Sequence, residues 1–120
     1  MHSHRKRFNS LIDQITLVFV SCRDAPEAID IARHALSHRL CASANVLHPV
    51  HSLYVWPPDE TIVEERAEAI LVLPTLESQV ADLERTVAER HSYGAACMLA
   101  APVSFAHESF VRWLQGEIRR

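Results

Sequence analysis

The chain has 120 residues, of which 48% are hydrophobic, and its formal net charge at pH 7 is −3. This balance excludes an intrinsically disordered chain and suits one domain with a modest core. The 12 Lys and Arg residues form no basic stripe, which argues against nucleic-acid binding. No apolar run reaches the length of a membrane span, and the segment after the basic N-terminus is too polar for a signal peptide. We therefore expect a cytoplasmic protein with no membrane partner.

The cysteine and histidine content bounds the chemistry. Cys22, Cys41 and Cys97 are odd in number and have no CxxC spacing, so neither a disulfide framework nor a zinc finger is indicated. The chain has eight histidines, more than packing alone needs, so each of them is considered as a possible metal ligand.

The first strand and helix are predicted by pattern. The β-branched and aromatic run Ile15–Ser21 is typical of a strand buried on both faces. Asp24 then predicts a helix N-cap, with Glu27 at the spacing of a capping box. Apolar residues at helical periodicity continue until the expected helix end near 38–40.

A long hairpin follows. Cys41–Val55 and Thr61–Leu73 are extended in character, and the Pro57–Glu60 cluster between them is a turn signal. Pro49 has no amide donor and predicts a bulge or a bend in the first arm. Acidic residues near the turn are interpreted as a solvated tip and edge, not as a catalytic pair: Asp59, Glu60, Glu64 and Glu65.

The second half repeats the alternation of strand and helix. Pro74 is expected to close the second arm, with Thr75 as the N-cap of an amphipathic helix that ends at His91. Ala95–Phe105 predicts the last core strand and His107–Ile118 a terminal helix. The apolar face of that terminal helix is expected to consist of Phe110, Leu114 and Ile118.

The predicted order, β-α-β-β-α-β-α, indicates an α+β fold. Two βαβ halves of similar length favour the ferredoxin-like arrangement, an antiparallel sheet with both helices on one face. We expect a flexible N-terminal tail over residues 1–14 and a single domain over 15–120.

Several short segments, spread over roughly residues 15–115, resemble one known family in content and in order. They are Val18–Asp24, Arg39–Ala42, Asn45, Ser52–Tyr54 with Trp56, Val87–Tyr93, and Pro102 with Trp113 and Leu114. Together they resemble the CutA family of divalent-cation tolerance proteins. The resemblance implies a ferredoxin-like homotrimer that responds to metal ions, binds a metal ion or small ligand in its intersubunit clefts, and is not an enzyme.

The resemblance also implies a metal site. The family's copper-binding proposal uses a cysteine, a histidine and a glutamate, and the matching positions here are Cys22, His91 and Cys97. The cofactor implied is copper or another divalent metal ion, and two thiolates with one imidazole suit Cu(I) or Zn(II). The chain departs from the family where the His-Pro-Tyr-Glu motif reads His91–Gly94, where Cys97 replaces the glutamate, and where Pro74 replaces a lysine.

Each candidate ligand has a structural alternative. Cys22 lies at a predicted helix N-terminus, which stabilises a thiolate, but a small buried cysteine is the competing interpretation. Cys97 alternates with Ala95 and Leu99 and is equally explained as a core residue of the last strand.

The other histidines are weaker candidates. His34 and His38 are one helical turn apart, yet they flank the apolar stripe and suit a solvated face. The remaining pairs are His48 with His51, which meet only across a bulge at Pro49, and His2 with His4 on the tail.

Two alternatives to metal binding remain. An enzyme requires Cys22 as nucleophile and His91 as base, but no orienting residue or oxyanion loop is evident. A PII-like trimeric sensor binding a small-molecule effector in intersubunit clefts shares the expected fold. Aromatic residues are expected in the core or at such clefts: Tyr54, Trp56, Tyr93 and Trp113.

Overall fold

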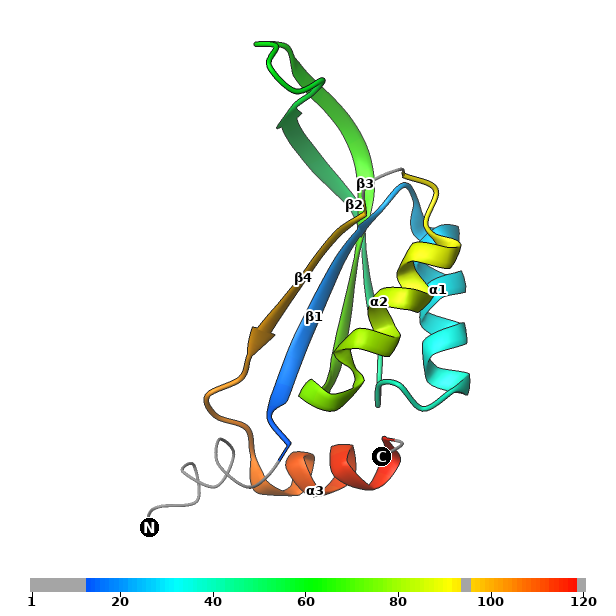
Figure 1. Cartoon of the computed structure of the whole chain (residues 1–120), viewed down its shortest axis with the longest axis vertical. Coiled ribbons are helices and arrows are strands. Elements are labelled where there is room, and N and C mark those ends of the chain that lie inside the picture. The colour runs from blue at the N-terminus through cyan, green and yellow to red at the C-terminus, as the bar shows by residue number, and fades with distance from the viewer. Residues whose placement is uncertain (1–12, 94–95, 119–120) are drawn as a thin grey trace.

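The computed structural model describes residues 13–93 and 96–118. Within these residues, strands and helices alternate as predicted, and the βαββαβ order followed by one more helix is that of the ferredoxin-like fold (Figure 1). A short 3-10 segment, Glu77–Gln79, precedes the second helix. The elements are β1 Ile15–Cys22, α1 Ala25–Ser37, β2 Asn45–Val55, β3 Val63–Leu76, α2 Val80–Arg90, β4 Cys97–Pro102 and α3 Glu108–Glu117.

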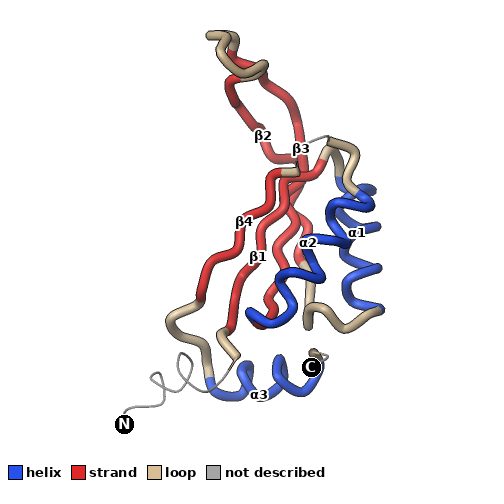
Figure 2. Tube along the Cα trace, viewed as in Figure 1, coloured by secondary structure: helices blue, strands red, loops and turns tan. Residues whose placement is uncertain are grey.

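The sheet is antiparallel throughout, in the order β2-β3-β1-β4. Helices α1 and α2 lie side by side on one face, and α3 lies across the end of the sheet far from the hairpin tip (Figure 2). We call the face away from α1 and α2 the open face. No helix in residues 13–93 and 96–118 has the length and hydropathy needed to cross a membrane.

The predicted tail, residues 1–14, falls almost wholly outside the described residues. Its last two residues are described and are hydrogen-bonded to the fold. The Asp13 carboxylate accepts from the Ser78 N–H at 3.0 Å, and Gln14 donates to the Val103 carbonyl at 2.9 Å.

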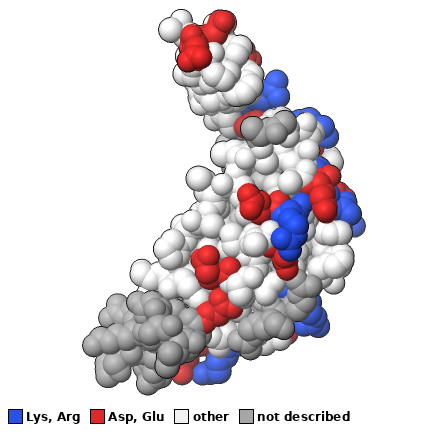
Figure 3. Space-filling view, in the orientation of Figure 1, with Lys and Arg blue, Asp and Glu red and all other residues white. Residues whose placement is uncertain are grey.

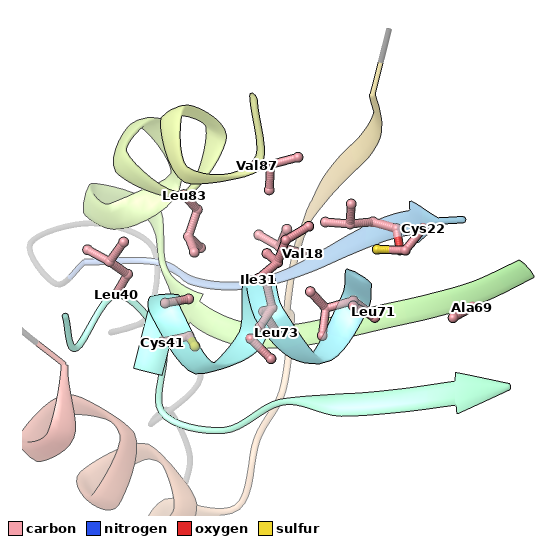
Figure 4. Packing of buried hydrophobic residues seen from close by; sticks show 14 residues of the cluster. Val18, Cys22, Ile31, Leu40, Cys41, Ala69, Leu71, Leu73, Leu83 and Val87 are labelled. Carbon is pink, nitrogen blue, oxygen red and sulfur yellow. The ribbon is translucent and has the colours of Figure 1, made fainter. Parts of the chain in front are cut away.

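The main core fills the space between the sheet and the two helices (Figure 4). Alternate residues of β1 point into it, and Val18, Val20 and Cys22 are fully buried. The intervening residues Leu17 and Phe19 lie on the open face and are only half-buried. The prediction that the first strand is buried on both faces is therefore confirmed for the face toward the helices. On the open face the strand is only half-buried in the single chain.

The start of α1 follows the predicted capping pattern. The Asp24 carboxylate accepts from the Glu27 N–H at 2.9 Å, and Glu27 reaches back to the Arg23 N–H at 2.8 Å. The helix ends at Ser37, one residue before the predicted range, and His38 is its C-cap.

The hairpin projects beyond the sheet. β1 pairs with β3 only as far as Cys22 opposite Ala69, so the part of the hairpin from Val50 to Glu68 has no further neighbouring strand among the described residues. We call this part the hairpin arm; it rises above the rest of the molecule in Figure 1. The register shifts between Leu47 and Val50, which agrees with the bulge or bend predicted at Pro49.

The prediction that Pro74 ends the second arm is wrong, because β3 continues to Leu76. β2 begins opposite Val72, so the missing N–H of Pro74 interrupts no pairing with β2. Thr75 is not a helix cap: its buried hydroxyl donates to the Leu40 carbonyl at 2.6 Å.

The predicted faces of the last strand are also reversed. β4 is shorter than expected, Cys97 is exposed, and Leu99 is 65% exposed on the open face. Met98 packs against the core instead. Ala95 lies outside the described residues. Because β4 is an edge strand covered on one face, a run of small apolar residues gave no signal for its orientation.

Helix α3 closes a second, smaller core at the end of the sheet. Val111, Leu114 and Ile118 are buried there with Ile15 and Leu76. Leu114 and Ile118 were predicted to be buried. Phe110 was also predicted to be buried, but this is wrong, because it is 36% exposed. Val111 is buried in the second core in its place.

Candidate functional site

A thiol, a carboxylate and an imidazole converge where β1 ends. Cys22 is the last residue of β1, Glu27 lies in the first turn of α1, and His91 follows the end of α2. One donor atom from each of these residues lies within 4.8 Å of the other two. The Cys22 residue is fully buried, and the side chains of His91 and Glu27 are 0% and 4% exposed. In the described part of the chain, no other group of three such donors occurs.

Glu27 is held by backbone amides. One carboxylate oxygen accepts from the Arg23 N–H and the other from the Ser92 N–H, both at 2.8 Å. Burial raises the pKa of Glu27, but the hydrogen bonds from Ser92 and Arg23 and the nearby His91 outweigh it, so the pKa is lowered overall. The carboxylate therefore joins the β1–α1 turn to the loop after α2.

Both nitrogens of the His91 ring are engaged. Nε2 lies 2.6 Å from the Ser21 carbonyl oxygen, which only accepts, so Nε2 carries the hydrogen. Nδ1 accepts from the Tyr93 N–H at 3.1 Å. These two contacts assign the neutral Nε2–H tautomer. A metal at Nδ1 would replace the contact with Tyr93, whereas a metal at Nε2 would shift the hydrogen to Nδ1 and so replace both contacts.

The Cys22 thiol is kept protonated. Burial, with smaller contributions from the charges of Glu27, Asp24 and Glu68, raises the pKa of Cys22 to about 12. The thiol lies 3.8 Å from the Val20 carbonyl oxygen, to which it donates. Burial of the Cys22 thiol therefore opposes the stabilisation of a thiolate that was expected from the helix N-terminus.

Cys97 does not belong to this group. It lies opposite Ser21 in the pairing of β1 with β4, so its side chain projects on the open face, away from Cys22. The alternative that Cys97 is a core residue is also wrong, because it is exposed. Sequence reasoning used Glu27 only as a capping residue. Its spacing from Asp24 was nevertheless the signal that its carboxylate turns back toward the end of β1.

The remaining histidines are arranged as surface groups. The rings of His34 and His38 are 4.3 Å apart between centroids on the outside of α1, and His38 is exposed. His51 contacts Glu65 at 2.7 Å across the hairpin arm, and His48 is exposed. The other predicted pair, His2 and His4, lies outside the described residues.

A separate cavity of about 670 Å³ lies along the hairpin arm and reaches Ser21 near the end of β1 and Cys97 at the start of β4. Three of the four predicted cleft aromatics line it: Tyr54, Trp56 and Tyr93. Trp113 is on α3, beside Phe110 and away from the cavity. The other lining residues are Ser21, Ser52, Leu53, Val55, Glu64, Arg66, Glu68 and Cys97.

One loop connects this cavity to the buried donor group. Tyr93 binds the His91 ring through its backbone N–H, and its hydroxyl donates to the Glu68 carboxylate in the cavity wall. Burial, with the hydrogen bond to Glu68, raises the pKa of the Tyr93 hydroxyl to about 12. The two sites lie on opposite faces of the sheet and share the segment from His91 to Tyr93.

Comparison with known sequences gives a consistent result. A family model described as CutA1 divalent ion tolerance protein matches residues 16–117. The Mus musculus protein named Protein CutA is 29% identical over 100 residues, which are 83% of this chain and 55% of the mouse protein. The Citrobacter koseri divalent-cation tolerance protein CutA is 28% identical over 108 residues, 90% of this chain and 91% of that protein. The chain thus spans about half the length of the mouse relative.

Solved structures agree. The crystal structure of CutA1 from Oryza sativa matches with a TM-score of 0.83 at 25% identity, covering 90% of this chain and 97% of that chain. CutA from Xylella fastidiosa matches with a TM-score of 0.82 at 26% identity, covering 88% and 99%.

Proposed function

The chain belongs to the CutA1 divalent ion tolerance family, and from that premise we propose that it responds to metal by binding a transition-metal cation, copper first, at Cys22 and His91. The observation that carries the proposal is the convergence of a thiol, an imidazole and a carboxylate from three separate segments within 4.8 Å. Glu27 serves as the third donor. The expected third ligand, Cys97, projects onto the opposite face of the sheet.

The donor types select the metal. Sulfur and imidazole nitrogen suit Cu(I), Cu(II) and Zn(II), whereas Ca(II) and Mg(II) require oxygen ligands. The donor atoms of Cys22, Glu27 and His91 lie within 4.8 Å of one another, so these residues would hold the ion and would supply one sulfur, one oxygen and one nitrogen ligand. The residues therefore fit a three-donor soft-metal site.

Binding at this site exchanges existing bonds. The thiol of Cys22 would lose its proton, and His91 would give up its contact with Tyr93 if it bound through Nδ1, or its contacts with both Ser21 and Tyr93 if it bound through Nε2. The pKa of Cys22, raised to about 12 by burial, makes the proton a strong competitor, so metal affinity increases with pH.

The same raised pKa argues against catalysis by Cys22. A nucleophilic cysteine has a depressed pKa beside a base that activates it. Cys22 has the opposite shift, and the nitrogen of His91 that bears no hydrogen accepts from the Tyr93 backbone. The proposal is therefore a binding protein, not an enzyme. The comparisons match CutA proteins and give no support to a PII-like sensor.

We also propose a homotrimer, because the chain leaves apolar surface uncovered. Leu99 and Leu47 on the open face are 65% and 52% exposed, and Phe19 between them is half-buried. In Figure 3, the left edge of the molecule between the hairpin arm and the grey atoms, where β4 lies in Figure 1, is white and so shows no Lys, Arg, Asp or Glu side chain in this view. The hairpin arm adds exposed Leu53 and Val63. Extra copies of the chain account for both the arm and the face.

The compartment that we propose is the cytoplasm. The cysteines Cys22, Cys41 and Cys97 are free, which suits reducing surroundings. Cell fractionation with an antibody against the chain tests this, and recovery from an oxidising compartment contradicts it.

Metal competition tests the proposed site. Full-length untagged protein is titrated with Cu(I) against a colorimetric chelator under reducing conditions, at two pH values. We expect Cys22→Ser to weaken Cu(I) binding by at least about tenfold, because a thiolate ligand is lost. Cys97→Ser is the matched control and should bind as the parent does. Affinity of the parent should increase with pH.

Two results contradict the site. Equal losses in Cys22→Ser and Cys97→Ser indicate non-specific thiol binding. Unchanged binding in both, with a loss on deletion of residues 1–8, indicates chelation by His2 and His4 instead.

A further inference from the structure

Two histidine rings lie side by side at the C-terminal end of α1, on the side of the sheet that the helices cover (Figure 2). The ring centroids of His34 and His38 are 4.3 Å apart, with an angle of 34° between the ring planes. His38 is exposed and His34 is half-buried. Histidines at positions i and i+4 share one face of a helix, and helical zinc sites use this spacing to place two imidazoles on one ion. The pair therefore has the spacing and the access that a chelate requires.

The hydrogen bonds of His38 leave its outer nitrogen available. Nδ1 lies 3.0 Å from the His34 carbonyl oxygen and 3.1 Å from the Ser37 hydroxyl, which itself donates to that carbonyl at 2.9 Å. The carbonyl only accepts, and the hydroxyl hydrogen is already used, so Nδ1 carries a hydrogen. In the neutral ring the lone pair is then on Nε2. A histidine that binds metal through one nitrogen commonly donates from the other to a backbone carbonyl, which fixes the ring. Unlike His91, His38 can thus bind a metal through Nε2 without losing a contact.

The end of the helix also favours a cation. His34 lies in the last turn of α1, and His38 is its C-cap. The C-terminus of a helix carries a partial negative charge that attracts cations within about one turn. Of the two arginines next to the pair in sequence, Arg33 is exposed, so water and salt screen its charge. Arg39 turns toward α3, where it donates to the Glu117 carbonyl at 3.1 Å and lies 3.6 Å from the Glu117 carboxylate. Neither arginine is therefore a strong obstacle to a bound cation.

We propose that His34 and His38 chelate one divalent transition-metal ion on the surface of α1, with water as the remaining ligands. In the described part of the chain, no third donor completes a group with this pair. Imidazole nitrogen suits Cu(II), Ni(II) and Zn(II), whereas Ca(II) and Mg(II) prefer oxygen. The site has no thiolate and faces solvent, so it is distinct from the buried group at Cys22 and independent of the proposal made for that group. Copies of the proposed trimer meet on the open face, and α1 covers the other face, so the pair stays accessible in the assembly.

The competing explanation is purely structural. His38 and Ser37 both donate to the His34 carbonyl near the end of the helix, and such bonds stabilise a helix C-terminus without any metal. This role predicts a loss of stability when His38 is replaced. It predicts no effect of replacing the His34 ring, and no response of either variant to a metal ion. Both histidines are therefore changed, one at a time.

Ni(II) is the probe, because it suits imidazole and is not reduced by the free thiols of the chain. Calorimetry with the full-length untagged protein measures binding, and Mg(II) is the ion that should not bind. His34→Gln and His38→Gln should each weaken the Ni(II) site by at least about tenfold, because one arm of the chelate is lost. Ni(II) should also raise the unfolding midpoint of the parent and leave that of both variants nearly unchanged, since only the folded helix holds the two rings together.

The matched control keeps two imidazoles on α1 but breaks their spacing. Arg33→His combined with His34→Gln places the histidines five residues apart, on different faces of the helix. This double variant should bind Ni(II) as weakly as His34→Gln alone. The loss of the Arg33 charge acts in the opposite direction, because it favours a cation. Cu(I) binding by His34→Gln should equal that of the parent, which separates this site from the one at Cys22.

Three results overturn the proposal. The first is parental Ni(II) affinity in both single variants, which assigns the binding to other histidines. The second is a loss in His38→Gln while His34→Gln binds as the parent does, because a chelate requires both rings. The third is parental affinity in the variant with altered spacing, which shows that single imidazoles bind the ion independently.

Discussion

At the scale of single residues, Glu27 links three parts of the fold. Its two oxygens hold the backbone amides of Arg23 and Ser92, and its own N–H is capped by Asp24. The β1–α1 turn and the loop after α2 are therefore joined at the end of β1 that carries Cys22. A charged acceptor in a buried position makes these hydrogen bonds stronger than neutral ones.

Glu27→Gln should destabilise the protein by about 1.5–3 kcal/mol, the range of a hydrogen bond to a charged group. The amide keeps the size of the side chain but turns a donor toward one of the two N–H groups. Urea unfolding at neutral pH measures the loss. Glu89→Gln, an exposed change on α2, is the control and should leave the midpoint unchanged.

The same variant has a pH signature. The pKa of Glu27 is lowered in the folded state, so its contribution is full above the unfolded value of 4.5 and is lost as pH falls through the folded value. The stability difference between parent and variant should therefore narrow in acid. A difference that stays constant as the pH is lowered below about 4.5 contradicts this role.

The site could be predicted from the sequence in part. The positions of Cys22 and His91 came from motifs, and the structure brings those two together. Cys97 came from a motif as well, but side-chain alternation in an edge strand places it on the other face. The pKa of Cys22 depends on burial, which a helix N-terminus in the sequence does not reveal.

At the scale of elements, local signals predicted most of the fold. The capping pattern at Asp24, the bulge at Pro49 and the periodicity of α2 each depend on neighbouring residues, and each is present. The end of β3 depends on where β2 begins, which is a long-range property, so Pro74 was wrongly taken as a boundary. Exposure of Phe110 is likewise decided by packing and not by periodicity.

Helix α3 offers a test of packing at this scale. Leu114→Ala should cost roughly 2–5 kcal/mol, because the side chain is fully buried against Ile15 and Leu76. Phe110→Ala is the paired change on the exposed side of the helix, and it should cost clearly less. Thermal or urea unfolding measures both. Equal costs would show that α3 packs on a different face from the one described.

At the scale of the whole molecule, one chain leaves its sheet half covered. The helices bury one face, while Leu99 and Leu47 remain exposed on the other and the hairpin arm extends beyond the last neighbouring strand. The sequence predicted the excess length of the hairpin. It gave no signal for the composition of the open face, because that face is shared among four strands far apart in the chain.

The proposed trimer predicts the effect of one charge on this face. Leu99 lies opposite Phe19 in the pairing of β1 with β4, and it is 65% exposed in the single chain. Leu99→Glu should therefore place a carboxylate in the interface between copies, where its desolvation opposes assembly. Light scattering at micromolar concentration should give the mass of three chains for the parent and a lower mass for the variant.

Ile29→Glu is the control for this prediction. It adds the same charge on the outer side of α1, where Ile29 is 40% exposed, and it should give the same mass as the parent. Circular dichroism checks that both variants keep the parent's fold, so that a lower mass reports assembly and not unfolding. A monomeric parent, or a Leu99→Glu variant that remains trimeric, would show that the open face is not where the copies meet.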